Sequence, residues 1–445
     1  MINAIPIWIR IILLAIIGGL VGQFINWAIY RFGATKTTVS PWSKPENDKL
    51  KRTWQDRLPI IGWLFLKRES SEFGKAHWVR PLAIEIFCVA ALPWFYQWIA
   101  GGGMTDPTVP IPVVPTAGQA DLWFFGLSIL TALLMIATFI DFDQRLIPDW
   151  ITVPGTIFAL LLHAFFPNFR LPITTAGAGI GTFVTEPLHF ATPNVMPTFH
   201  YGVWGMVAAL AIFSIWIAAL LPYVYLPNSP FWKRTKTVWG VMWRQTTRKS
   251  KLPVHSFFRQ VIFVFLAIWI VGAAAIALSW FSLPAVNCDA LFGSFAGMAI
   301  GGAIVWGIRI VAGIALGQEA MGFGDVTLMA MIGAFLGWQP ALITFGIAPF
   351  AALLIVFVYF LITKDSYLAF GPYLALGAII VFMFWGTVWP AVRFQFKFAI
   401  VLLAALAVSL LIMGPLLVLV RAIKEKALGI ESSAEQFENG GKNGQ

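Results

Sequence analysis

Long apolar runs separated by short polar segments dominate this chain. Most of the runs hold about 20 residues, the length of helix that crosses a bilayer. They lie near 8–29, 81–99, 121–141, 150–166, 203–226, 259–282, 289–312, 326–338, 341–362, 370–390 and 396–420. The runs lack the alternation of barrel strands, so helices are the predicted spanning form. The pattern predicts an all-α, polytopic membrane helix bundle with about 11 transmembrane spans.

One run is too short for an ordinary span. The segment 326–338 falls well below about 20 apolar residues. We expect it to be tilted, to lie where the membrane is thinned, or to be lined partly by protein.

Composition and charge agree with a membrane protein and predict its orientation in the membrane. The 445 residues are 59% hydrophobic and 11% charged, which excludes a soluble domain, and the runs are too many for one signal peptide. With the N-terminus outside and the C-terminus cytoplasmic, 26 of the 30 Lys and Arg residues fall inside, as the positive-inside rule requires. The net charge of +10 is therefore a topological bias, and it predicts no nucleic-acid partner. Two cysteines, Cys88 and Cys288, allow neither a CxxC zinc site nor a disulfide framework.

The runs and the polar segments divide the chain into seven parts. They are a first transmembrane helix (1–30), a basic cytoplasmic loop domain without CxxC pairs (31–80), a membrane core (81–166), an insertion with two spans (167–285), a second membrane core (286–390), an extra C-terminal helix (391–426) and a disordered tail (427–445). The insertion carries a basic block at 233–259, for which we expect contact with anionic lipid headgroups of the inner leaflet, with recruitment of substrate as the alternative.

Two carboxylates stand where apolar runs end on the inner side. Asp141 closes the run 121–141, and Asp325 follows Gly322 and Gly324 just before the run at Val326. An ionisable group at a membrane boundary usually marks function, although Asp325 could simply cap a helix. Two carboxylates brought together resist double ionisation, so one can act as base while the other donates a proton. The matching depth of the two residues predicts that they meet, and such a pair meets the requirement for peptide hydrolysis by acid–base catalysis. Gly322 and Gly324 leave the backbone free to bend and approach a ligand.

Four further residues belong to the candidate site. Asp143 is the third choice for a site acid, and Asp149 suits a helix cap or a supporting residue better than a catalyst. Pro148 fits the start of the next helix, where its missing N–H costs little. Glu319 is expected to position the site or to carry a solvated charge.

Five segments together resemble the prepilin peptidases, the GxGD aspartic membrane proteases. They are the acidic motif 141–149, the glycine motif 319–325, the first-helix signature at 22–31 (GQFINWAIYR), the segment 59–63 (PIIGW) and the turn 370–373 (FGPY). The resemblance covers roughly 1–165 and 289–390. It implies that Asp141 and Asp325 are catalytic, and that the basic leader of type IV prepilins or pseudopilins is cleaved at the cytoplasmic face of the bacterial inner membrane. It implies no cofactor for proteolysis, and S-adenosylmethionine only if N-methylation of the new terminus is retained.

The chain also departs from that family. Its loop 31–80 has no cysteine where family members often carry two CxxC pairs for zinc, so we expect no metal and leave methylation open. Thr327 stands where the family usually has Lys. Residues 167–285 and the chain after 390 have no counterpart in the compact family core.

Two other interpretations of the sequence stay open. One is a different GxGD intramembrane protease, related to presenilin or to archaeal preflagellin peptidase. The other is a non-enzymatic transporter or assembly factor, which predicts acids in broken helices at mid-bilayer depth.

Overall fold

The computed structural model of the chain describes residues 5–33, 39–43, 52–110, 113–177, 182–194, 202–225, 254–316, 321–363 and 370–428. The longer helices are α1 (Ile7–Phe32), α4 (Val79–Ala100), α5 (Ala117–Gln144), α6 (Asp149–Phe165), α7 (Val203–Tyr225), α9 (Val254–Ser282), α10 (Ala285–Leu316), α12 (Trp338–Thr363) and α15 (Ala399–Leu428). The shorter ones are α2 (Ile61–Leu66), α3 (Ser70–Phe73), α11 (Phe323–Leu336), α13 (Gly371–Met383) and α14 (Trp385–Phe396). Single 3-10 turns lie at Trp54–Arg57, Lys67–Glu69 and Pro167–Phe169.

Several of these helices can cross a bilayer. In the described part of the chain, six are long and apolar enough: α1, α4, α5 and α10 entire, with Phe263–Ser282 of α9 and Ala399–Val420 of α15. Shorter apolar helices add α6, α11 and parts of α7 and α12. The chain is thus an all-α, multi-pass membrane bundle. The count of eleven spans and the orientation stay predictions.

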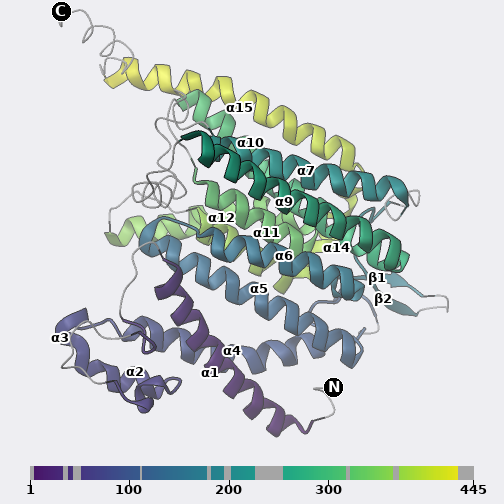
Figure 1. Ribbon diagram of the computed structural model, residues 1–445. Helices are drawn as coiled ribbons and strands as arrows, with labels where there is room; N and C mark the ends of the chain where they lie inside the picture. Colours follow the sequence, from purple (N-terminus) through teal and green to yellow (C-terminus); the bar gives the residue numbers. More distant parts are fainter. Residues whose placement is uncertain are drawn as a thin grey trace, which may run out of the picture.

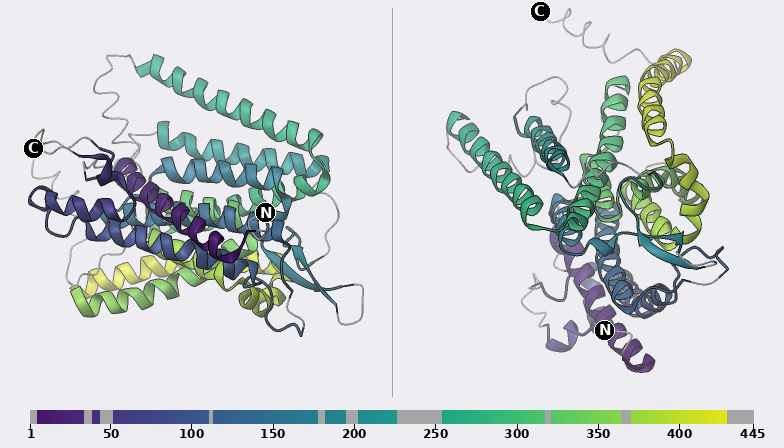
Figure 2. Two further views of the ribbon diagram at one scale, coloured as in Figure 1. Left: turned by 90° about the horizontal axis from the view of Figure 1, so that it is seen from below. Right: turned by 90° about the vertical axis from the view of Figure 1, so that its right-hand side faces the viewer.

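The bundle carries different structures at its two ends. Figure 1 shows α2 and α3 at one end and, at the other, the hairpin of strands β1 (Pro172–Ala176) and β2 (Phe183–Pro187), with α1 along one flank. Figure 2 shows α15 and the pair α7 and α9 standing out from the rest of the bundle. Within their span windows, α9 buries 6% of its residues and α15 none, as helices facing lipid would.

The chain departs from the predicted span at 370–390. The apolar run predicted there as a span is not a single straight helix, because α13 and α14 meet at a bend of 96°. Beyond the bend, the indole N–H of Trp385 donates to the carbonyl of Pro172 at 2.6 Å. Gly386 lies against the carbonyl of Thr105, where an added Cβ would come within 2.0 Å. These contacts turn the chain while it stays apolar, so hydropathy alone carried no sign of the break.

A small hairpin lies in the insertion, between α6 and α7. Strands β1 (Pro172–Ala176) and β2 (Phe183–Pro187) pair antiparallel, with Pro172 opposite Pro187. An all-α prediction did not include this small sheet. Most of the basic block 233–259 and of the tail 427–445 lies outside the described residues.

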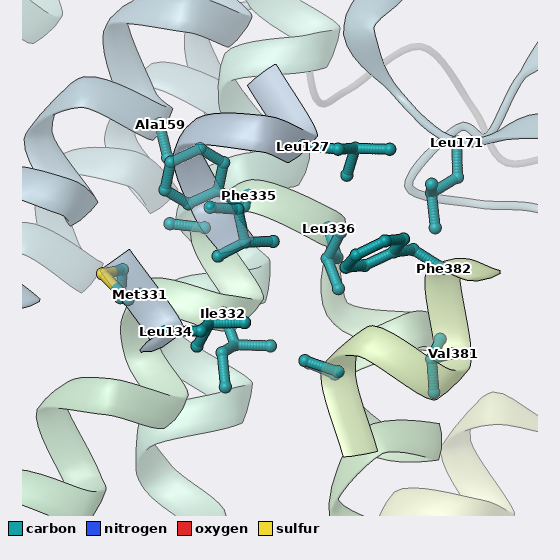
Figure 3. Packing of buried hydrophobic residues seen from close by; sticks show 14 of the residues in the cluster. Leu127, Leu134, Ala159, Leu171, Met331, Ile332, Phe335, Leu336, Val381 and Phe382 are labelled. Atoms are coloured by element: carbon teal, nitrogen blue, oxygen red, sulfur yellow. The ribbon is translucent and has the colours of Figure 1, made fainter. Parts of the chain in front are cut away.

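Helix α11 lies in the middle of the bundle. All of its residues from Asp325 to Leu336 are buried, so the short run is lined by protein, one of the three arrangements expected for it. Gly333 of α11 crosses Gly297 of α10 so closely that a Cβ on either would lie 2.0 Å from the other's carbonyl oxygen. Small residues at such a crossing let two membrane helices approach backbone to backbone. Figure 3 shows Phe335 and Leu336 of α11 inside the apolar core.

One buried carboxylate on α4 forms hydrogen bonds with both α1 and the loop domain. Glu85 of α4 is fully buried and accepts hydrogen bonds from the indole N–H of Trp63 at 2.8 Å and from the Asn26 amide at 3.2 Å. It also accepts from the backbone N–H of Ile60. Gly22 of α1 lies against Glu85, with room for no side chain, since a Cβ would come within 2.8 Å of its Cα. The N-terminal motifs read from the sequence therefore meet at one point.

Within the loop domain, Arg52 joins segments that are apart in sequence. Its guanidinium forms two hydrogen bonds with the Glu69 carboxylate, at 2.6 and 3.1 Å, and the two side chains are 3% and 1% exposed. It also donates to the carbonyls of Ser40 at 2.6 Å and Ser43 at 3.0 Å. A planar guanidinium suits such fork-shaped, bidentate pairing. This cation-centred contact organises the described part of a loop that has no cysteines.

Candidate active site

Asp141 lies in the last turn of α5, at the C-terminal end of the helix. It lies four residues before Arg145, which adopts a left-handed conformation (φ 54°) and donates its N–H to the Asp141 carbonyl at 2.8 Å. This left-handed cap ends the helix and sends the chain back toward α6. The Asp141 carboxylate is 6% exposed and accepts a hydrogen bond from the backbone N–H of Gly371, the first residue of α13.

Asp325 is held in the first turn of α11. The helix has Gly322 as its N-cap, and Asp325 is its third residue. Its carboxylate reaches back to accept the N–H of Gly322, as the third residue of a capping box does. Asp325 therefore does not cap the helix from the N-cap position that its sequence context suggested. It is 7% exposed, and its Oδ1 is buried without a hydrogen-bond partner among the described residues.

The two carboxylates face one site. The charge of Asp141 acts directly on Asp325. Ile147 links the segments that carry them, because a Cβ on Gly324 would lie 2.7 Å from the Ile147 Cβ and a Cβ on Gly371 would lie 2.6 Å from its Cδ1. The fold thus brings together two acids that are 184 positions apart, as their matching depth predicted.

Arg309 supplies the cation beside this pair. It lies in α10, is 7% exposed, and its charge acts on Asp325. Its Nε–H donates to the carbonyl of Met321 at 2.9 Å, and its guanidinium stacks 5.7 Å from the centre of the Phe323 ring. Arg309 therefore fixes the start of α11 and partly neutralises the charge of Asp325. The positive-inside count places it among the inside loop cations, whereas it lies within a helix.

The other predicted site residues have different places. Asp143 forms a bidentate ion pair with Arg80, at 2.6 and 2.8 Å, with the side chains 34% and 37% exposed. Pro148 is the N-cap of α6, and Asp149 is its first residue, as expected for a helix start. Glu319 lies outside the described residues.

The two glycines of the motif contribute space and not backbone freedom. Neither has a positive φ. Gly324 lies directly on Ile147, and its close approach is to that side chain rather than to a ligand. At Gly322 an added Cβ would meet Asp325 Oδ2 at 3.6 Å, an ordinary van der Waals distance.

Three site residues were missed from the sequence. Gly371 and Ile147 both lie inside motifs that were noted, but their contacts depend on the meeting of α5, α11 and α13. Arg309 had a usable signal, since an ionisable side chain inside an apolar run is a functional candidate by default.

The described residues gather no cluster of metal ligands beside the acids. Among them, no three His, Cys, Asp or Glu side chains lie closely enough to hold a metal ion. The groups that the described chain brings to the site are two carboxylates, two backbone N–H donors and a guanidinium.

Comparisons with known proteins add the family context. Residues 16–98 match the family model described as the bacterial peptidase A24 N-terminal domain. The chain is 34% identical over 94 residues to the prepilin leader peptidase/N-methyltransferase of Escherichia coli (strain K12), which covers 21% of this chain and 40% of that protein. The protein of the same name from Pseudomonas aeruginosa is 37% identical over 109 residues, 24% of this chain and 36% of the relative.

A longer match reaches into the membrane core. The prepilin leader peptidase/N-methyltransferase of Myxococcus xanthus (strain DK1622) is 24% identical over 211 residues, 47% of this chain and 57% of that protein. The chain thus spans between 36% and 57% of the length of these three relatives. No solved structure matches the chain. The comparisons confirm the resemblance to prepilin peptidases that the motifs indicated.

Proposed function

We propose that this protein is an aspartic endopeptidase of the bacterial inner membrane. It cleaves the basic leader from prepilin-like or pseudopilin proteins at the cytoplasmic face. One observation carries the proposal: Asp141 and Asp325, from separate parts of the chain, are both buried at one site, and Asp325 Oδ1 accepts no hydrogen bond from the part of the chain that the structure describes. A buried acceptor without a partner is costly, so a fold that keeps one has a use for it.

The pair works as an acid and a base. The ionised carboxylate takes a proton from water, whose oxygen attacks the scissile carbonyl carbon. The protonated carboxyl donates to the carbonyl oxygen, so a neutral tetrahedral intermediate forms. When the intermediate collapses, the carboxyl that took the proton from water gives it to the leaving nitrogen, and the C–N bond breaks. The other carboxylate takes a proton from a hydroxyl of the intermediate, so the pair again holds one proton. The two carboxyl groups titrate as a unit, so the shared proton is assigned to the pair and not to one residue.

Neighbouring groups hold the pair in position. The N–H groups of Gly371 and Gly322 each orient one carboxylate. Arg309 balances the negative charge and holds the start of α11. Preorganised donors of this kind lose little free energy to reorganisation during reaction.

Methylation of the new terminus is a separate question. The names of the relatives include an N-methyltransferase. The methyl donor that the family resemblance implies for this chain, if methylation is retained, is S-adenosylmethionine. That molecule carries adenine, ribose and amino-acid groups that need polar partners. The cavity of about 660 Å³ between α4, α5 and α13 has mostly apolar walls, and its Arg80 is paired with Asp143. The residues of this cavity do not fit the cofactor.

The proposal is tested by incubating the purified protein with a prepilin-like substrate and sequencing the new N-terminus of the product. Asp141→Asn and Asp325→Asn should each lower the rate by about 10²–10⁴-fold, because each removes one half of the acid–base pair. Asp143→Asn is the matched control, since this acid pairs with Arg80, and it should keep most of the activity. Near-normal cleavage by either of the first two variants would contradict the assignment.

A further inference from the structure

A groove opens between α4, α5 and α13. Its volume is about 660 Å³, and its walls include Ala91 of α4, Ala132 of α5 and Ile379 of α13. Phe87 and Trp94, also in its lining, are 56% and 57% exposed. The groove therefore opens toward the lipid-facing surface, where something apolar must fill it.

The groove begins at the candidate active site. Pro372 in its wall directly follows Gly371, the donor to Asp141. Thr138, also in its wall, lies one turn before Asp141 on α5. The Arg80 side chain, paired with Asp143, lines the same end. An apolar segment lying in the groove would therefore have one end level with the two acids.

The walls suit a helix better than a lipid tail. Ala83, Ala91 and Ala132 are small, and small residues line contacts between membrane helices. Ser128, further along α5, places a buried Oγ in the lining, and this hydroxyl forms no hydrogen bond within the described residues. An acyl chain has no group to satisfy that hydroxyl, whereas a polypeptide helix has polar groups that can.

We propose that this groove binds the apolar helix of the proteolytic substrate, a single-span protein with a basic segment before that helix. The proposal rests on the proposed function, because the leader junction must lie level with Asp141. Ser128 lies thirteen positions before Asp141, about 20 Å along the helix axis. A substrate helix that starts at the acids and follows α5 brings the residue about thirteen positions past the cleaved bond level with Ser128.

Narrowing the groove tests the proposal. Ala91→Trp and Ala132→Trp place bulk in it, with Ala132→Leu as a milder variant should the larger ones fold poorly. Ala90→Trp is the matched control, since Ala90 neighbours Ala91 but is exposed and not part of the lining. Two substrates are compared: a full-length single-span protein and a soluble peptide with only the leader junction.

The narrowing variants should raise KM for the full-length substrate about tenfold or more, with kcat little changed. Cleavage of the short peptide, and both reactions of Ala90→Trp, should match the wild type. Unchanged KM for the full-length substrate, or equal loss with both substrates, would overturn the groove assignment. If the wild type cleaved neither substrate, the proposed function would fail instead.

Photo-crosslinking gives a readout that needs no cleavage. A photoreactive side chain about thirteen positions past the junction of the substrate should crosslink to peptides containing Ser128 or Ile379. The yield should fall in Ala132→Trp. Crosslinks from a photoreactive group placed at Ala132 to phospholipid only, with substrate present in excess, would show the groove to be a lipid site and overturn the proposal.

Discussion

At the scale of single residues, Gly322 and Gly324 differ in how much space surrounds them for a side chain. Gly324 lies against Ile147, and an added Cβ would come within 2.7 Å of the Ile147 Cβ and 3.0 Å of its carbonyl oxygen. Real Cβ atoms essentially never come within 3.0 Å of another heavy atom, as this one would at the Ile147 Cβ, so the start of α11 or Ile147 would have to move. Asp325, the next residue, would move with it.

We predict that Gly324→Ala lowers the cleavage rate by about 10²-fold, because a misplacement near 1 Å is enough for such a loss. Gly322→Ala is the matched control, since it keeps the backbone N–H and its Cβ would meet Asp325 Oδ2 at 3.6 Å and the Gly324 nitrogen at 3.9 Å, both ordinary van der Waals distances. The rates of both variants on one substrate, with thermal unfolding recorded alongside, measure the difference. Equal rates in the two variants would contradict the role given to Gly324.

The departure at Thr327 also has a local explanation. Its hydroxyl is hydrogen-bonded to Thr152 of α6 at 3.0 Å, and Thr152 and Thr327 are 0% and 7% exposed. Thr152 donates this bond, and the Thr327 hydroxyl in turn donates to the carbonyl of Gly324 at 3.1 Å, so a Lys here would have to bury an ammonium where a satisfied hydroxyl now lies. The cation near Asp325 comes instead from α10, as Arg309.

At the scale of elements, the crossing of α10 and α11 sets where the acidic motif lies. Gly297 and Gly333 allow the backbones to touch, and Ser294 adds a hydrogen bond of 2.6 Å to the carbonyl of Ala334. Without a hydrophobic driving force between helices in lipid, close packing and such hydrogen bonds hold them together.

We predict that Gly297→Ala destabilises the protein by about 1–3 kcal/mol, the cost of overpacking a close contact. Gly293→Ala is the control on the same helix, because a Cβ there meets nothing within 4 Å. Thermal unfolding in a fixed detergent compares the two. A lower midpoint for Gly293→Ala than for Gly297→Ala would show that the crossing is not tight.

At the scale of the whole molecule, the two ends of the bundle should lie in different compartments. The loop domain with α2 and α3 is at one end and the hairpin at the other (Figure 1). The charge bias predicts that the first end is cytoplasmic. Cys88 and Cys288 are both buried, so a thiol reagent should react mainly with an added, exposed cysteine.

We predict that Glu186→Cys in the hairpin reacts with a membrane-impermeant thiol reagent added to intact cells, and that Glu72→Cys in α3 does not. Both positions are exposed, so each should react once the membrane is dissolved in detergent. Labelling of Glu72→Cys alone in intact cells would reverse the orientation and place the acids on the other face.

The class of the protein and the residues of its acid pair could be predicted from the order of amino acids alone. Apolar runs of bilayer length must form helices, because lipid offers no hydrogen-bond partners and the backbone has to satisfy its N–H and C=O groups within the segment. Asp141 and Asp325 could be chosen because carboxylates at the ends of such runs are costly. These are properties of single segments, so they can be read along the chain.

The contacts between these segments could be learned only from the tertiary structure. The 96° bend after α13 keeps the hydropathy of a span, and it became visible through the contacts of Trp385 and Gly386. The contacts of Gly371 with Asp141, and of Arg309 with Asp325, join residues from different helices. Hydropathy and spacing report on one segment at a time, whereas these contacts depend on how closely two backbones can approach. That distance is set by packing in three dimensions.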